Sequence, residues 1–136
     1  MDTGSCLCGA VQYEITGGVG EMGHCHCSMC RKAHGAAFGT YANVNWEQFR
    51  VTKGEDMIAR YESSPGTTRT FCKQCGATLQ FITDGKKRFG IAAGTLDTDP
   101  GVRPNYQIWT SDKAPWWDLT GTNLSHDTAP GLEKNP

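Results

Sequence analysis

Seven cysteines in a chain of 136 residues are the feature of this sequence best suited to chemistry. Buried structural cysteines have no reason to cluster, whereas a turn that presents two thiolates to one ion is how proteins hold zinc. An odd count argues against a complete disulfide framework. The sequence therefore predicts zinc sites. The cysteines fall into three tight groups: Cys6 and Cys8; Cys25, Cys27 and Cys30; Cys72 and Cys75.

Two of these groups are pairs, and each pair is followed directly by a glycine that lets the backbone curl beneath a metal. Two pairs together supply the four ligands of a closed structural zinc site. Such a site would tie the N-terminus to a hairpin distant in sequence, a plausible use of zinc in a small β domain. The expected structural site consists of Cys6, Cys8, Cys72 and Cys75.

The remaining group, Cys25, Cys27 and Cys30, supplies three thiolates and leaves no cysteine for a fourth position. Catalytic zinc sites commonly keep three protein ligands and one exchangeable position, so an open catalytic zinc is the leading interpretation. The alternative is a closed site of three cysteines and one histidine. His34 is the best candidate for that role, because it follows Cys30 by four residues on a predicted helix.

Charged and aromatic residues near this group have two interpretations each. Arg31 and Lys32 could offset thiolate charge and attract an anionic substrate, or form the solvated face of a short helix. The tryptophans at 109, 116 and 117 could wall a pocket, although such residues more often belong to the core or cover it. The aromatic candidates are Trp109, Trp116 and Trp117.

Short alternating segments separated by glycine-rich turns predict an all-β fold, a small zinc-stapled β-sheet sandwich with at most one or two short helices. One helix is expected at residues 28–34, with Ser28 as its N-cap. A hairpin turn is expected at Asp84 and Gly85. Strands are expected at residues 11–15, 36–44, 49–51, 57–61, 68–71, 78–82 and 88–93.

Length and charge indicate one domain, expected at residues 1–117, followed by a polar C-terminal tail at residues 118–136. The formal net charge of −1 argues against a nucleic-acid partner. No apolar run is long enough to span a membrane, and no signal-peptide pattern opens the chain. A cytoplasmic location, where thiols stay reduced, is therefore expected.

The chain resembles the glutathione-dependent formaldehyde-activating enzyme family, which includes centromere protein V. Five segments carry the resemblance, in the family's order and over nearly the whole chain up to residue 117. They are GSCLCGAVQY at residues 4–13, HCHCSMCRK at 24–32, RTFCKQCG at 69–76, AGTLD at 93–97 and KAPW at 113–116. At Gln107 the chain departs from many members, which carry histidine before the following isoleucine.

The resemblance implies the same division into a structural four-cysteine zinc and a catalytic three-cysteine zinc. It also implies a carbon–sulfur lyase activity that joins glutathione and formaldehyde to S-hydroxymethylglutathione, or breaks that adduct. The partner would then be a small thiol such as glutathione. The proton-transfer residue stays open, with His24, His26 and Asp97 as candidates. A non-catalytic zinc-stabilised scaffold for protein interaction or metal handling is the competing hypothesis.

Overall fold

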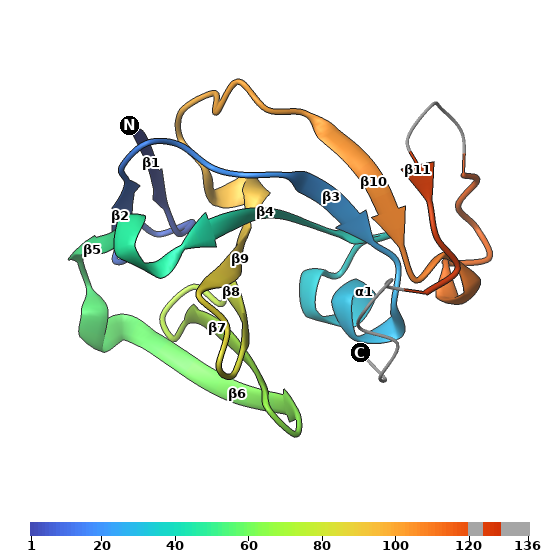
Figure 1. Cartoon of the computed structure of the whole chain (residues 1–136). Helices are drawn as coiled ribbons and strands as arrows, with labels where there is room; N and C mark the ends of the chain where they lie inside the picture. The colour runs from blue at the N-terminus through green and yellow to red at the C-terminus, as the bar shows by residue number, and fades with distance from the viewer. Residues whose placement is uncertain (120–123, 129–136) are drawn as a thin grey trace.

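A computed structural model describes residues 1–119 and 124–128. Within these residues the chain is mostly β-strand, with one α-helix and two sheets, so the predicted all-β class is confirmed. Figure 1 shows the strands and the helix α1 beside β3 and β4. No helix in these two described ranges is long and apolar enough to cross a membrane.

The smaller sheet has three antiparallel strands in the order β1-β2-β5. The strand predicted at residues 11–15 is β2, in which Tyr13 and Ile15 are buried while Gln12 and Glu14 are not. This period-two alternation places one face of the sheet on the core. The strands are β1 (Asp2–Ser5), β2 (Gln12–Ile15) and β5 (Phe49–Lys53).

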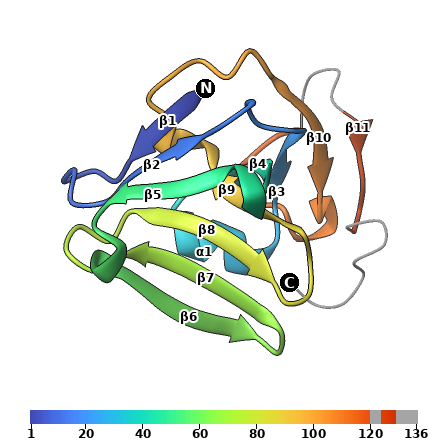
Figure 2. The same cartoon turned by 60° about the vertical axis from the view of Figure 1, so that its left-hand side comes forward.

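In the described part of the chain, the larger sheet has eight strands in the order β11-β10-β3-β4-β9-β8-β7-β6. In the sheet order from β3 through β4, β9, β8 and β7 to β6, each pair of neighbouring strands is antiparallel. In contrast, β10 pairs parallel with both β3 and β11. Figure 2 shows β6, β7 and β8 side by side, with β5 next to β8 in that view. The strands are β3 (Met22–Cys25), β4 (Gly39–Asn45), β6 (Ile58–Ser64), β7 (Thr67–Cys72), β8 (Thr78–Thr83), β9 (Arg88–Ala92), β10 (Pro104–Ile108) and β11 (Leu124–Ser125).

The helix α1 (Ser28–His34) has the predicted bounds, but its N-cap differs from the prediction. Cys27, not Ser28, is the cap: its backbone is extended, and its sulfur accepts a hydrogen bond from the Cys30 amide at 3.2 Å. The helix ends at Gly35, whose φ of 61° places it in the left-handed region. The described residues also contain four 3₁₀ turns: Trp46–Gln48, Glu55–Met57, Ala93–Thr95 and Thr110–Asp112.

The main core lies between the two sheets. Tyr13 and Ile15 of β2 belong to one buried cluster with residues of the large sheet, and Phe49 of β5 packs against it. Burial of such side chains stabilises the fold by about 1.5–3 kcal/mol each. The large-sheet members are Met22, Ala42, Val44, Ile82, Phe89 and Ile91.

The boundary expected after residue 117 stays a prediction. Within the expected tail, β11 pairs with β10, and the backbone amide of His126 donates to the carbonyl of Gln107 at 2.8 Å. The rest of the expected tail at residues 120–123 and 129–136 lies outside the described residues.

Gly54 provides a test of how closely the turn after β5 approaches the end of the first cysteine turn, just before β2. Its φ is 80°, and a Cβ there would overlap the carbonyl oxygen of Ala10. Gly85 has a φ of 75°, but a Cβ added there would meet nothing within 4 Å, so it is a matched control. We expect Gly85→Ala to cost about 1–2 kcal/mol of unfolding free energy from backbone strain alone. Gly54→Ala should cost about 1–3 kcal/mol more, measured by urea denaturation; equal losses would contradict the close approach.

Candidate metal centres

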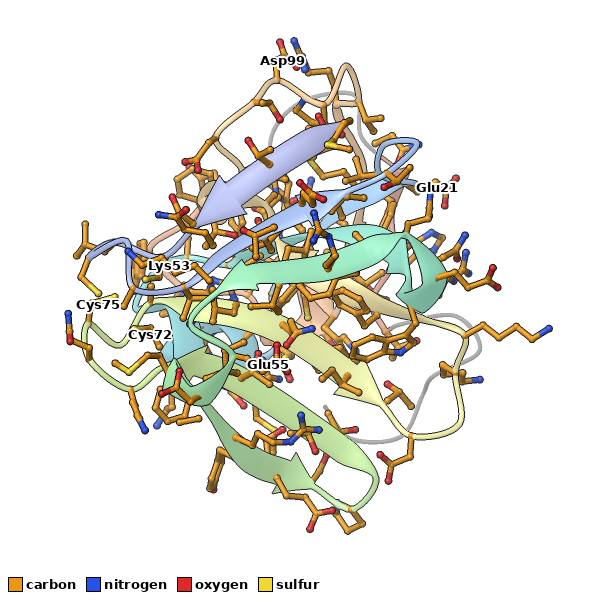
Figure 3. All side chains as sticks on the ribbon, turned by 90° about the vertical axis from the view of Figure 1, so that its left-hand side faces the viewer. Glu21, Lys53, Glu55, Cys72, Cys75 and Asp99 are labelled. Atoms are coloured by element: carbon orange, nitrogen blue, oxygen red, sulfur yellow. The ribbon has the colours of Figure 1, made fainter. Side chains whose placement is uncertain are left out.

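Cys6, Cys8, Cys72 and Cys75 meet at one point, with all four sulfurs within 4.8 Å of one another. The first pair lies in the turn between β1 and β2; Cys72 is the last residue of β7, and Cys75 lies in the turn from β7 to β8. These strands belong to different sheets, so the cluster joins the two sheets. Figure 3 shows Cys72 and Cys75 together at one end of the molecule, on the same side as Lys53.

The sulfur spacing of this group fits zinc. A tetrahedral site with zinc–sulfur bonds of about 2.3 Å places its sulfurs about 3.8 Å apart. Here Cys6 Sγ lies 3.7 Å from Cys8 Sγ, and Cys8 Sγ lies 3.8 Å from Cys72 Sγ. The Val11 amide donates to Cys6 Sγ at 3.2 Å and the Cys75 amide to Cys72 Sγ at 3.5 Å. Such amide donors stabilise thiolates, so the backbone is arranged for charged sulfurs.

Both turns close in the same manner. Gly9 has a φ of 80° and donates its amide to the carbonyl of Cys6, and Gly76 has a φ of 77° and donates to that of Cys72. The glycine after each pair is thus required by left-handed backbone geometry. The apolar side chains of Val11 and Leu79 pack with Cys6 and Cys72 beneath the turns.

Cys25, Cys27 and Cys30 form the second cluster, again with sulfurs within 4.8 Å of one another. Cys25 is the last residue of β3, Cys27 caps α1, and Cys30 lies in the first turn of that helix. A strand end and a helix start therefore aim three sulfurs at one point within six residues. All three are buried, with exposures of 7%, 0% and 2%.

The histidines near this cluster have other hydrogen-bond partners. His34 Nε2 lies 2.8 Å from the Tyr41 hydroxyl, and His24 Nδ1 lies 2.8 Å from Thr40 Oγ1. The cluster of potential ligands contains three cysteines and no histidine within the described part of the chain. This arrangement does not supply the closed site with His34 as fourth ligand.

Gln107 of β10 is the hydrogen-bond partner of His26. The two side chains are 2.6 Å apart, from His26 Nε2 to Gln107 Oε1, and both are buried. The side chain of His26 therefore points towards β10, whereas those of its sequence neighbours Cys25 and Cys27 belong to the cysteine cluster. Its Nδ1 is buried without a hydrogen-bond partner among the described residues.

Arg69 of β7 is the cation beside the cysteines, and sequence analysis missed it. Its Nη1 lies 3.5 Å from Cys30 Sγ and 3.2 Å from the Tyr41 hydroxyl, and the residue is only 6% exposed. Hydrogen bonds from the thiols of Cys25 and Cys27, and then the charge of Arg69, lower the pKa of Cys30 to about 3 against the effect of burial. Arg69 is the single charged residue of β7. Because a buried charge needs a partner of opposite charge or a hydrogen-bond acceptor, a lone arginine in a buried strand is the sequence signal that could have identified it.

Arg31 and Lys32, the cations expected beside the three cysteines, do not occupy the position that Arg69 has. Lys32 is exposed and Arg31 is half-buried, and neither donates a hydrogen bond to a cysteine sulfur within the described residues. Asp97 is also separate from the three cysteines. It is exposed, accepts a hydrogen bond from Ser5 Oγ at 2.7 Å, and donates its amide to Thr3 in β1.

Of the three tryptophans, Trp109 packs against the three-cysteine cluster, together with Ile108 and Tyr41. Its φ of 55° is the single positive value for a non-glycine residue within the described ranges. Trp117 contacts the ring of Phe38 at a centroid distance of 5.6 Å, and Trp116 is 69% exposed. Trp109 therefore walls the cluster, whereas Trp116 lies on the surface.

Comparison with known proteins places the chain in a family. The sequence pattern of the glutathione-dependent formaldehyde-activating enzymes matches residues 1–112, and the chain belongs to this family. An uncharacterized lyase of Schizosaccharomyces pombe is 29% identical over 117 residues, which cover 85% of this chain and 83% of the relative.

A Halomonas elongata protein with the provisional name glutathione-dependent formaldehyde-activating enzyme is 28% identical over 128 residues, or 85% of this chain and 79% of the relative. The fold is similar to the crystal structure of a Rhodobacter sphaeroides protein, with a TM-score of 0.60 and 24% identity. That similarity covers 73% of this chain and 92% of the other, and it supports the fold alone.

Two clusters with room for one ion each predict two zinc ions per chain. Elemental analysis of protein purified without chelator measures this ratio, and titration with a thiol reagent reports which sulfurs remain free. One zinc per chain would contradict the prediction for the second site if Cys25, Cys27 and Cys30 are reduced. Their reaction with the reagent after unfolding, in the absence of reductant, shows that they are.

The positions of the clusters predict different consequences for Cys72→Ser and Cys27→Ser. Cys72→Ser removes a sulfur that joins the two sheets, so thermal stability should fall sharply, because metal binding there is part of the folding free energy. Cys27→Ser should remove only the second metal, since serine can still cap α1. Melting temperatures and metal content of both variants test this; equal destabilisation would show that both clusters are structural.

Proposed function

We propose that this protein is a zinc-dependent carbon–sulfur lyase that acts on a small thiol adduct of the S-hydroxymethylglutathione type. In this proposal Cys6, Cys8, Cys72 and Cys75 hold a structural zinc. Cys25, Cys27 and Cys30 hold a catalytic zinc whose fourth position receives the substrate. The family supports a lyase activity, and glutathione is the thiol named in the family's description.

The observation that carries the proposal is the three-sulfur cluster without a fourth protein ligand among the described residues. The sulfurs come from a rigid strand end and helix start, and the nearby histidines are held by Tyr41, Thr40 and Gln107. Zinc in such a site would hold an incoming thiol as the nucleophilic thiolate.

Arg69 suits the charge that this chemistry builds up. Three cysteine thiolates and one divalent ion carry a formal charge of about −1, and a substrate thiolate would add another negative charge. A buried guanidinium at 3.5 Å from Cys30 Sγ offsets part of this charge and donates a hydrogen bond to the sulfur. Removing the Arg69 charge should therefore weaken the binding of an anionic thiolate.

A non-catalytic zinc scaffold is the second candidate, and the burial of the cluster favours it. Cys27 is 0% exposed and Cys30 is 2% exposed, as expected for a structural site that exchanges no ligand. The two functions differ in one measurable property, since only the enzyme needs the second metal to accept an external thiol.

Cobalt substitution measures that property, because absorption from thiolate to cobalt grows with each sulfur ligand. We expect glutathione to raise this absorption in the protein that carries cobalt in both clusters, or to bleach it if the thiol removes the metal. Cys27→Ser protein, which keeps only the closed four-cysteine site, is the matched control and should not respond. An unchanged spectrum of the parent protein at about millimolar glutathione would contradict the proposal and favour the scaffold.

A further inference from the structure

The hydroxyl of Tyr41 is the centre of a hydrogen-bonded group next to the three-cysteine cluster. It lies 2.8 Å from His34 Nε2 and 3.2 Å from Arg69 Nη1. The same Nη1 lies 3.5 Å from Cys30 Sγ, and the ring of Tyr41 packs against the cluster. Tyr41, His34 and Arg69 come from β4, α1 and β7, so only the folded chain brings them together.

The hydrogen-bonding capacity of this hydroxyl decides what it can do. A phenol has two acceptor lone pairs and one proton to donate. A guanidinium only donates, so Arg69 occupies one lone pair of Tyr41. When His34 carries its proton on Nε2, it occupies the other lone pair, and the phenol proton is then free for a ligand. A phenol is ordinarily protonated at neutral pH, so the hydroxyl has this proton to donate.

Arg69 offers a second unused donor at the same place. Its Nε donates to Ser63 Oγ at 3.2 Å, and its guanidinium lies over the Phe81 ring, 4.9 Å from the centroid. Its Nη2 is buried and has no hydrogen-bond partner among the described residues. Nη2 is bonded to the same carbon as the Nη1 that contacts Tyr41 and Cys30. Buried donors are rarely left unpaired, so this atom points to a ligand acceptor.

We propose that Tyr41 and Arg69 form an oxygen-binding site beside the three cysteines. The Tyr41 hydroxyl and Arg69 Nη2 donate hydrogen bonds to the oxygen of the carbonyl or hydroxymethyl group that reacts with the thiol. His34, in its Nε2–H form, is the positioning residue that aims the Tyr41 proton. This inference rests on the proposed function for the identity of the substrate, and it adds the groups that stabilise its oxygen.

The bond changes explain why donors are needed there. When the thiolate sulfur attacks formaldehyde, a carbon–sulfur bond forms, the carbon–oxygen π bond breaks, and its electron pair moves to oxygen. The oxygen then gains one proton, equal to the one that the thiol lost, so the step needs no other reactant. In the reverse direction the hydroxyl loses its proton, the carbon–oxygen π bond forms and the carbon–sulfur bond breaks. Preorganised donors at this oxygen stabilise the charge in both directions.

Gly39 shows that the position of His34 is specific. A Cβ on Gly39 would lie 2.7 Å from His34 Nε2, so only glycine at the start of β4 leaves room for the imidazole. The His34 and Tyr41 rings also meet edge to face, at a centroid distance of 5.2 Å and an interplanar angle of 86°. The imidazole is therefore held by packing as well as by its hydrogen bond.

The tautomer of His34 is a test that needs no activity. Nitrogen-15 NMR of the zinc-loaded protein distinguishes protonation at Nε2 from protonation at Nδ1, and assignment comes from comparison with the His34→Gln variant. We expect Nε2–H. An Nδ1–H tautomer would overturn the inference, because the Tyr41 proton would then be donated to His34.

The second test is the rate at which the protein exchanges carbon-13 formaldehyde between its free form and S-hydroxymethylglutathione, measured by magnetisation-transfer NMR. Tyr41→Phe should slow the catalysed exchange about 100-fold, as expected for loss of one donor to a developing oxyanion. Its affinity for glutathione, measured on the cobalt form, should change less than about twofold, because Tyr41 acts on the oxygen and not on the sulfur. His34→Gln keeps a side-chain N–H and should retain most of the rate, whereas His34→Leu should lose as much as Tyr41→Phe.

The outcomes separate this inference from the proposed function. A parent protein that neither binds glutathione nor speeds exchange overturns both. An active parent whose Tyr41→Phe variant keeps the full rate overturns the oxygen site alone. Equal losses in His34→Gln and His34→Leu, at melting temperatures equal to the parent's, would also overturn the role given to His34.

Discussion

The meeting of four cysteine sulfurs between two sheets is the constraint on which the rest of the structure depends. The β1–β2 turn belongs to the smaller sheet and the β7–β8 turn to the larger one, and the sulfurs lie at the spacing that one tetrahedral zinc requires. β7 ends at Cys72, three residues after Arg69. Fixing that cysteine therefore fixes the position of the arginine that contacts Cys30, so the structural cluster supports the second cluster through one strand.

The second cluster combines local and distant contributions. Its three sulfurs come from residues 25–30, where β3 ends and α1 begins, so the ligands themselves are close in the sequence. Its environment is entirely long-range: Arg69 supplies a positive charge, Tyr41 a hydroxyl, and Trp109 an aromatic wall. The three cysteines, close in sequence, suit metal binding, and the residues from distant segments suit the binding of a substrate at the metal.

The sequence predicted what depends on local pattern. Thiolate spacing gave both clusters, alternation gave β2, and the hairpin signal at Asp84 and Gly85 marked the end of β8, because these features act over a few residues. β3 was missed because Met22 and Gly23 are both buried, and Gly23 does not follow a period of two: a Cβ there would collide with the Tyr106 ring of β10. Arg69 was missed because its partner Cys30 is 39 residues away. Cys27 replaced Ser28 as the helix cap because its sulfur is already turned towards the cluster.

X-ray absorption at the zinc edge, before and after addition of glutathione, tests the central claim most directly. One closed four-sulfur site and one open three-sulfur site average about 3.5 sulfur ligands per zinc. The account predicts this value for the protein alone, with oxygen at the open position, and a rise to about 4 when glutathione binds. An average that stays at about 3.5, with an imidazole nitrogen as the remaining ligand in both samples, would contradict it.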